Sequence, residues 1–194
     1  MDGFKKRTQQ KMETIEQHTI KLLSLPINEI KIADIAKLAN VSQVSIYNYY
    51  ESKENLLKLA LKKYFDDQIE RFEKTVNSKN AFDEKLKMIL LQKKESAKSI
   101  HPTTLYELMH SDPELSEYIK AISKEKSIPL FFKLIEEGKQ LNKIRETINP
   151  NALLVYLNLF SQSLGGMTEE SLAMIQEGTI MDDILNLFFY GILK

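Results

Sequence analysis

The segment that most constrains the fold is residues 30–57, IKIADIAKLANVSQVSIYNYYESKENLL. Its first half carries apolar residues at the i, i+3, i+4, i+7 spacing of one buried helix face, namely Ile32, Ile35, Ala36 and Ala39. Asn40 ends this helix, because Asn tolerates the left-handed conformation of a tight turn. Ser42 is a natural N-cap for a further short helix that runs to about Tyr49. The pattern predicts a helix-turn-helix.

Helical patterns also occupy the rest of the chain. A first helix covers about residues 8–23, and its buried face takes Met12, Ile15, His18 or Thr19, and Leu22 or Leu23. Ser52 opens a fourth helix that reaches the mid-70s. The later helices are expected at about 82–99, 102–110, from Asp112-Pro113 to 139 with a kink or division at Pro129, from Asn149-Pro150 to 164, and 181–193. Strand-type alternation is missing, and only six Gly and five Pro occur.

The predicted fold class is therefore all-α, with an N-terminal three-helix helix-turn-helix domain at residues 1–63. A second helical domain is expected to follow at residues 64–194.

Several functional classes lack support in this sequence. There is no cysteine, which excludes disulfides, thiolate metal sites and a cysteine nucleophile. The three histidines, His18, His101 and His110, do not have metal-ligand spacing, and no nucleophile-elbow, phosphate-binding or dinucleotide-binding motif occurs. We predict no catalytic residue, no metal and no cofactor.

No segment of the sequence indicates secretion or membrane insertion. The most apolar run, residues 187–193, is too short to cross a bilayer. No apolar stretch follows Lys5, Lys6 and Arg7, as a secretory signal would require. We expect a cytoplasmic protein without a membrane partner.

Charge is distributed unevenly, although the net charge is zero. Residues 1–63 hold eleven Lys and Arg against seven Asp and Glu, whereas residues 64–194 hold sixteen against twenty. A basic end on an acidic body suggests that one end binds a polyanion, but a solvated charged face explains the imbalance equally well. Lys5, Lys6 and Arg7 either add phosphate contacts from a flexible arm or merely keep the chain soluble.

The third helix divides into an inner and an outer face. Ile46 and Tyr50 lie four residues apart and are expected to face inward together with Val41, toward Ile35, Leu38 and Leu57. The outer set then contains Gln43, Val44, Ser45, Tyr47, Asn48 and Tyr49. It has no carboxylate, and it offers hydroxyls, amides and one apolar side chain, which phosphates and base edges accept.

This segment resembles the TetR family of transcription regulators. The family pattern combines an IA-x-x-AGVS turn, a Tyr-x-Tyr/His-Phe segment and a Ser-Lys-Glu-x-Leu helix start. In this chain the three read IAKLANVS at 35–42, YNYY at 47–50 and SKENL at 52–56, and the likeness covers residues 8–64. Three positions depart from the pattern: Asn40 replaces the turn glycine, Lys31 replaces a capping Thr, and Val44 replaces an early Gly or Pro.

The resemblance implies roles for individual residues. Its base contacts would be Gln43, Val44, Ser45 and Asn48, and its phosphate contacts Ser42, Tyr47, Tyr49 and Lys53. Ser42 serves more simply as a helix cap. The alternative for Tyr47 and Tyr49 is that they are half-buried core residues that keep a hydrated hydroxyl. Lys53 lies in the first turn of a helix, where free backbone N–H groups also favour an anion.

The C-terminal half would supply dimerisation and regulation. The resemblance implies a two-fold four-helix interface made from apolar helices at 152–164 and 184–193, with Ile184, Leu187, Phe188, Tyr190 and Leu193 as its candidate residues. The alternative is that these side chains form intramolecular core. Aromatic residues with a few polar tips suit a pocket for an apolar or amphipathic small molecule, although core packing explains them too. They are Tyr106, Met109, His110, Tyr118, Phe131, Phe132, Ile135 and Tyr156.

Together these features predict a homodimeric, sequence-specific regulator of transcription. We expect a repressor that binds a palindromic operator in double-stranded DNA and is released by a small-molecule effector. One alternative is a helical enzyme or ligand carrier with a vestigial DNA-binding head, which the missing catalytic constellation disfavours. Another is a structural DNA binder without an effector.

Overall fold

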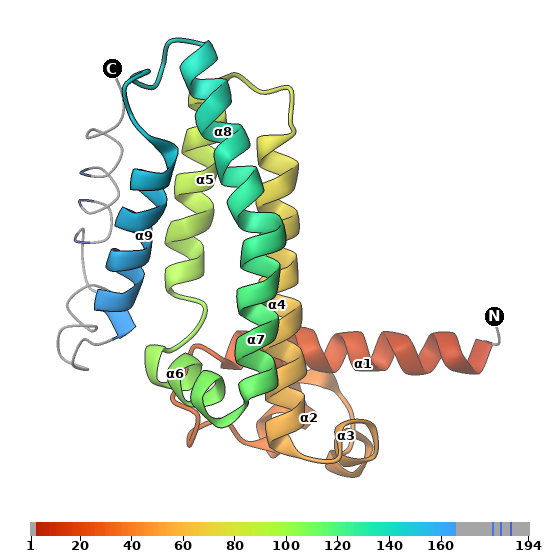
Figure 1. Cartoon of the computed structure of the whole chain (residues 1–194). Helices are drawn as coiled ribbons and strands as arrows, with labels where there is room; N and C mark the ends of the chain where they lie inside the picture. Colours follow the sequence, from red (N-terminus) through yellow and green to blue (C-terminus); the bar gives the residue numbers. More distant parts are fainter. Residues whose placement is uncertain (1–2, 166–179, 181–182, 184–186, 188–194) are drawn as a thin grey trace. The chain divides into compact units, whose positions relative to one another are not determined.

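The computed structural model describes residues 3–165 and the single positions 180, 183 and 187, and within them the chain is helical throughout its regular elements (Figure 1). The helices are α1 Gly3–Leu22, α2 Ile32–Ala39, α3 Gln43–Tyr50, α4 Lys53–Val76, α5 Phe82–Ala97, α6 Pro102–Ser111, α7 Pro113–Ile122, α8 Ile128–Gln140 and α9 Pro150–Gly165. A π-helical turn, Ser123–Ser127, joins α7 to α8. The predicted all-α class is confirmed.

The chain divides into two compact units. The first contains Met1–Gln68 and Ser99–Lys120, and the second contains Ile69–Lys98 and Ala121–Lys194. The division falls within α4, so that the first unit holds α1 to α3, the first part of α4, α6 and most of α7.

The core of the first unit forms around one face of α1. Ile15, Thr19 and Leu23 have no exposed area, and they are spaced by four residues as one helix face requires. Thr19 satisfies its hydroxyl by donating a 2.8 Å hydrogen bond to the carbonyl of Ile15. The choice that the sequence left open, between His18 and Thr19 and between Leu22 and Leu23, is thereby settled in favour of Thr19 and Leu23.

The segment of α6 and α7 joins this first core, which the sequence pattern did not reveal. The backbone N–H of His101 donates to the carbonyl of Leu23 at 2.7 Å, and the hydroxyl of Thr104 donates to the carbonyl of Leu25 at 2.7 Å. Leu108 and Leu115 are buried in the same cluster. Two carbonyls at the end of α1 thus obtain partners from residues nearly 80 positions later.

Charged side chains strengthen the same junction. The Lys58 ammonium lies 2.8 Å from Asp112 and 2.7 Å from Glu114, and the Lys62 ammonium lies 3.1 Å from Glu114. The hydrogen bonds from Lys58 hold the pKa of Asp112 and of Glu114 below their usual values. Asp112 also accepts the backbone N–H of Leu115 at 2.9 Å, so the predicted N-cap of the Asp112-Pro113 helix is confirmed.

The second unit has its own core between α5, α8 and α9. Phe82, Leu86 and Ile89 of α5 cluster with residues from α4, α8, α9 and the segment between α8 and α9, namely Val76, Leu134, Ile135, Ile144 and Leu153. A buried ion pair joins α5 to α8, because the Lys85 ammonium lies 2.7 Å from Glu137 and also donates to the carbonyl of Val76 at 2.9 Å. The cation therefore has the partners that a buried charge requires.

Two sequence expectations need correction. α1 begins at Gly3 rather than near Thr8, so Lys5, Lys6 and Arg7 are exposed positions on a helix and not a flexible arm. α7, the π-helical turn and α8 follow one another without a break, so the helix is not divided at Pro129, and the wider π-helical turn lies directly before this residue. The predicted C-terminal helix at 181–193 lies outside the described residues except for positions 183 and 187.

Within the described part of the chain, no helix is long and apolar enough to span a membrane.

Candidate nucleic-acid interface

The turn between α2 and α3 has the predicted conformation. Asn40 adopts the left-handed region, with φ 53° and ψ 47°. The backbone N–H of Val41 donates to the carbonyl of Ala36 at 3.0 Å, which satisfies an acceptor at the end of α2. At its other end α2 begins after Lys31, whose side chain makes no capping hydrogen bond, so this departure from the family pattern leaves the helix start without a side-chain cap.

Ser42 caps α3, as the sequence indicates. Its hydroxyl oxygen accepts the backbone N–H of Ser45 at 3.1 Å, and the two serine hydroxyls lie 2.9 Å apart. The same contact restricts the Ser45 hydroxyl, which is a candidate base contact. Ser42 therefore has a structural role whether or not it also contacts a phosphate.

Two residues anchor α3 from behind. Ile46 and Tyr50 have no exposed area. The Tyr50 hydroxyl donates to the carbonyl of Met12 at 3.1 Å and to the carboxylate of Glu16 at 3.2 Å, both on α1. Burial, followed by the negative charge of Glu16, raises the pKa of Tyr50 above its ordinary value, so the phenol stays protonated. This contact orients α3 on the body of the first unit.

The opposite face of α3 is open to solvent. Gln43 and Asn48 are exposed, and Val44 and Tyr47 have exposed fractions of 67% and 47%. Ser45 is half-buried, and so is Tyr49, whose ring lies edge-on to Tyr50 at a centroid distance of 6.4 Å. α3 contains no carboxylate. The division into inner and outer faces agrees with the sequence analysis, whereas the individual DNA contacts stay predictions.

Leu38 was placed wrongly by the sequence analysis. It was expected in the core behind α3, but 47% of it is exposed. The reason is visible in the helical spacing, because the buried residues of α2 are Ile32, Ile35, Ala36 and Ala39, and position 38 is absent from that stripe. Leu38 thus adds an apolar side chain to the exposed surface of α2 near the turn.

The start of α4 completes this surface. The Ser52 hydroxyl accepts the backbone N–H of Asn55 at 3.0 Å, and the Asn55 amide donates to the carbonyl of Tyr50 at 3.0 Å. Lys53 is half-buried, and its ammonium donates to the carbonyl of Ile27 at 2.8 Å. An ammonium has three protons, so this bond orients Lys53 and leaves two donors for a phosphate.

The predicted pocket residues fall in both units. Tyr106, Met109, His110 and Tyr118 belong to the first unit, and Phe131, Phe132, Ile135 and Tyr156 to the second. Ile135 is core. The exposed Tyr106 ring stacks on His110 with a centroid distance of 4.2 Å. The Tyr118 hydroxyl donates to Asp66 at 2.7 Å, and burial together with this bond raises the pKa of Tyr118 to about 12. A shared pocket stays a prediction.

Of the predicted dimer residues, Ile184, Phe188, Tyr190 and Leu193 lie outside the described residues, and Leu187 is exposed. α9 also exposes apolar side chains, because Val155, Tyr156 and Leu159 are each at least half exposed. No group of three or more potential metal ligands occurs among the residues that the structure describes.

Comparison with known proteins relates the helix-turn-helix segment to one family. Residues 26–60 match the model of bacterial regulatory proteins of the tetR family, which are the residues that form α2, α3 and the start of α4. The likeness to the tetR family is thus shown for this helix-turn-helix segment. A fatty acid metabolism regulator protein from Bacillus subtilis (strain 168) is 28% identical over 125 residues, covering 63% of this chain and 64% of the regulator.

Solved structures of TetR-type regulators share the fold at low sequence identity. A TetR transcriptional regulator from Chloroflexus aurantiacus aligns with a TM-score of 0.68 at 17% identity, covering 97% of this chain and 98% of that one. The transcriptional regulator FadR from Bacillus subtilis, in complex with stearoyl-CoA, aligns with a TM-score of 0.56 at 20% identity, covering 92% and 98%. Both are regulators of transcription by their descriptions.

Proposed function

We propose that this chain is a sequence-specific DNA-binding regulator of transcription that acts as a repressor and leaves its operator when an effector binds. One observation carries the proposal: α3 presents an uncharged polar face to solvent while Ile46 and Tyr50 fix it from behind. Exposed amides and hydroxyls on a rigid helix are what reading of base edges requires. The family model matched at residues 26–60 supports the same assignment.

We infer that the helix-turn-helix domain recognises DNA as part of a homodimer bound to a palindromic operator. One head of this size neutralises few phosphates, and two heads at fixed spacing bind two half-sites one helical turn apart or a multiple of it. The exposed apolar stripe of Val155, Tyr156 and Leu159 on α9 favours dimerisation through this helix, because a contiguous apolar face of this kind is stabilised by burial.

The effector in this proposal is a small molecule with an apolar tail. Support comes from the fatty acid metabolism regulator to which 63% of this chain is similar, and from the stearoyl-CoA complex of a protein with the same fold. Release from DNA requires that the effector bind more tightly to the conformation whose heads do not match the operator spacing.

Selection from a pool of random duplexes with the purified full chain tests this function. We expect enrichment of one palindromic sequence, and release of that duplex on addition of stearoyl-CoA. Gln43→Ala should weaken binding to the selected duplex by about 1–3 kcal/mol and change binding to an unrelated duplex much less, because Gln43 is proposed to read bases. Gln17→Ala, an exposed change on α1, is the matched control.

The alternative of an enzyme or carrier with a vestigial head makes the opposite prediction. It expects no enriched sequence, and equal affinity of wild type and Gln43→Ala for every duplex. That result would refute the proposed function.

A further inference from the structure

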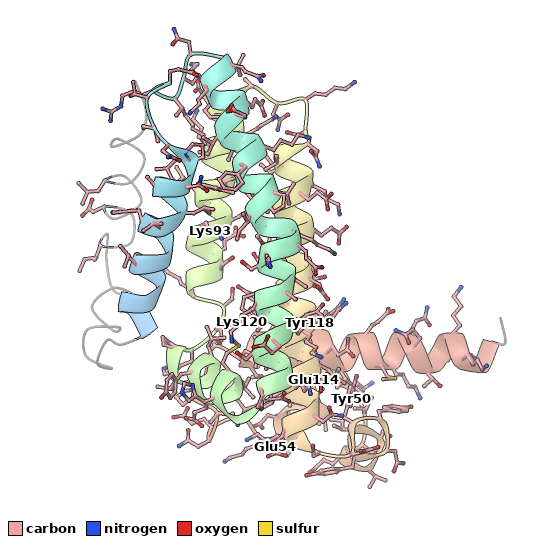
Figure 2. All side chains as sticks on the ribbon, in the orientation of Figure 1. Tyr50, Glu54, Lys93, Glu114, Tyr118 and Lys120 are labelled. Carbon is pink, nitrogen blue, oxygen red and sulfur yellow. The ribbon has the colours of Figure 1, made fainter. Side chains whose placement is uncertain are left out.

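Lys93 occupies an unusual position on α5. Lys93, which Figure 2 labels, follows Phe82, Leu86 and Ile89 at offsets of eleven, seven and four residues. This spacing places it on the same helix face as these three core residues. Unlike them, its side chain remains exposed to solvent. The face of α5 that is buried at positions 82, 86 and 89 is therefore exposed to solvent at position 93, where the residue is a lysine.

The surroundings of Lys93 follow from contacts on both sides of it. The Gln92 amide donates to the Thr75 hydroxyl at 3.0 Å, and the Arg71 guanidinium lies 3.0 Å from Glu95. These two bonds place the turn of α5 that contains Lys93 opposite the turn of α4 that contains Phe72. Phe72 is partly buried and packs against the core of the second unit.

α8 provides a second apolar neighbour at this level. α5 and α8 run in opposite directions (Figure 1), and Lys85 of α5 pairs with Glu137 of α8 at 2.7 Å. Both helices rise by about 1.5 Å per residue. The eight residues from Lys85 to Lys93 therefore correspond to eight residues back from Glu137, which reaches Pro129, next to Leu130 and Phe131. Both pack partly buried against the same core.

Lys93 has no counter-ion among the described residues. The side chains three and four positions away on α5, at 89, 90, 96 and 97, are Ile, Leu, Ser and Ala, and none of them is a carboxylate. Lys85, two turns earlier on α5, is paired with Glu137 and a backbone carbonyl. The surrounding protein lowers the pKa of the Lys93 amine, because desolvation disfavours the cation. Its position on the core-facing side of α5, at the level of Phe72, Leu130 and Phe131, and its exposure to solvent place Lys93 at an apolar edge of the second core.

An unpaired ammonium between apolar side chains is complementary to an amphipathic anion. We propose that Lys93 receives the anionic head group of an apolar-tailed effector within the second unit. The contact supplies the missing counter-ion, while Phe72, Leu130 and Phe131 contact the first carbons of the tail. This inference rests on the proposed function only in calling the ligand an effector. A free carboxylate and the phosphates of an acyl-CoA share the required chemistry.

Isothermal titration calorimetry of the full chain with four probes tests the inference: oleate, methyl oleate, stearoyl-CoA and coenzyme A. We expect oleate or stearoyl-CoA to bind, and whichever of them binds identifies the source of the anion. Methyl oleate has no charge and should bind at least about tenfold more weakly than oleate, and coenzyme A has no tail and should not bind. Lys93→Met should lower the affinity for the bound anion about tenfold or more, whereas Lys93→Arg keeps the charge and should restore most of it.

Lys87→Met on the exposed face of the same helix is the matched control and should leave every affinity unchanged. The inference is overturned if Lys93→Met binds the anion as tightly as wild type, or if neither oleate nor stearoyl-CoA binds. Duplex binding is measured on the same preparations. If the chain binds DNA and Lys93→Met does not change the affinity for the anion, the anion site alone is refuted. If the chain does not bind DNA but Lys93→Met weakens binding of the anion, the proposed function alone is refuted.

Discussion

Replacing Tyr50 with Phe removes one buried hydroxyl and nothing else from the anchor of α3. That hydroxyl has a single proton, shared between the Met12 carbonyl at 3.1 Å and the Glu16 carboxylate at 3.2 Å, so the change deletes one hydrogen bond rather than two. A bond to a neutral acceptor contributes about 0.5–1.5 kcal/mol and one to a charged acceptor about 1.5–3. The Met12 carbonyl belongs to α1, and Glu16 keeps partial access to water. We therefore expect Tyr50→Phe to lower the free energy of unfolding by about 1.5 kcal/mol.

Urea denaturation followed by circular dichroism at neutral pH measures this difference. Tyr47→Phe is the matched control, because Tyr47 lies on the exposed face of the same helix. Its free energy of unfolding should stay within about 0.5 kcal/mol of wild type. Equal unfolding curves for Tyr50→Phe and wild type would contradict the assigned role of this hydroxyl.

The pH dependence provides an independent check. The pKa of Tyr50 is raised in the folded state, so its protonated form is favoured there. The stabilisation is fully present below the pKa of an unfolded tyrosine, about 10, and decreases as the pH rises above that value. The gap between wild type and Tyr50→Phe should consequently narrow above about pH 10. Tyr118, with a pKa near 12, titrates in both proteins and cancels from the difference. A gap that widens with pH would refute the reasoning.

Two further predictions concern other parts of the chain. Lys53→Ala should weaken binding to all duplexes alike and reduce the slope of log K against log salt by roughly 1, since an ammonium that contacts a phosphate displaces one counterion. Titrations at several salt concentrations measure the slope, and an unchanged slope would exclude the phosphate contact. Gly138→Ala should destabilise the chain by about 1–3 kcal/mol, because an added Cβ would lie 2.6 Å from the Phe82 ring and 2.7 Å from the Ile144 side chain. Thermal unfolding measures the second effect. The reverse change Ala33→Gly, at an exposed position of α2, measures the helix-propensity difference of roughly 1 kcal/mol that favours alanine, so destabilisation by Gly138→Ala is due to the clash.

Local chemistry in the sequence determined much of the first unit. The stripe of Ile32, Ile35 and neighbouring alanines, the left-handed Asn40 and the capping Ser42 each act within one turn of helix. Such features are readable because their partners lie three or four residues away. The inward position of Ile46 and Tyr50 followed from the same spacing, and Leu38 was misplaced only where that spacing was not applied.

Only the tertiary structure decided which distant residues meet. The Tyr50 hydroxyl donates to α1, the His101 backbone N–H and the Thr104 hydroxyl donate to carbonyls near the end of α1, and Lys58 pairs with Asp112 and Glu114. Each pair is more than 30 residues apart, and periodicity carries no information about such a contact. The same holds for Lys93, which is one lysine among many in the sequence. The pKa of its amine is lowered by desolvation, which comes from neighbouring elements and which no local sequence pattern reports.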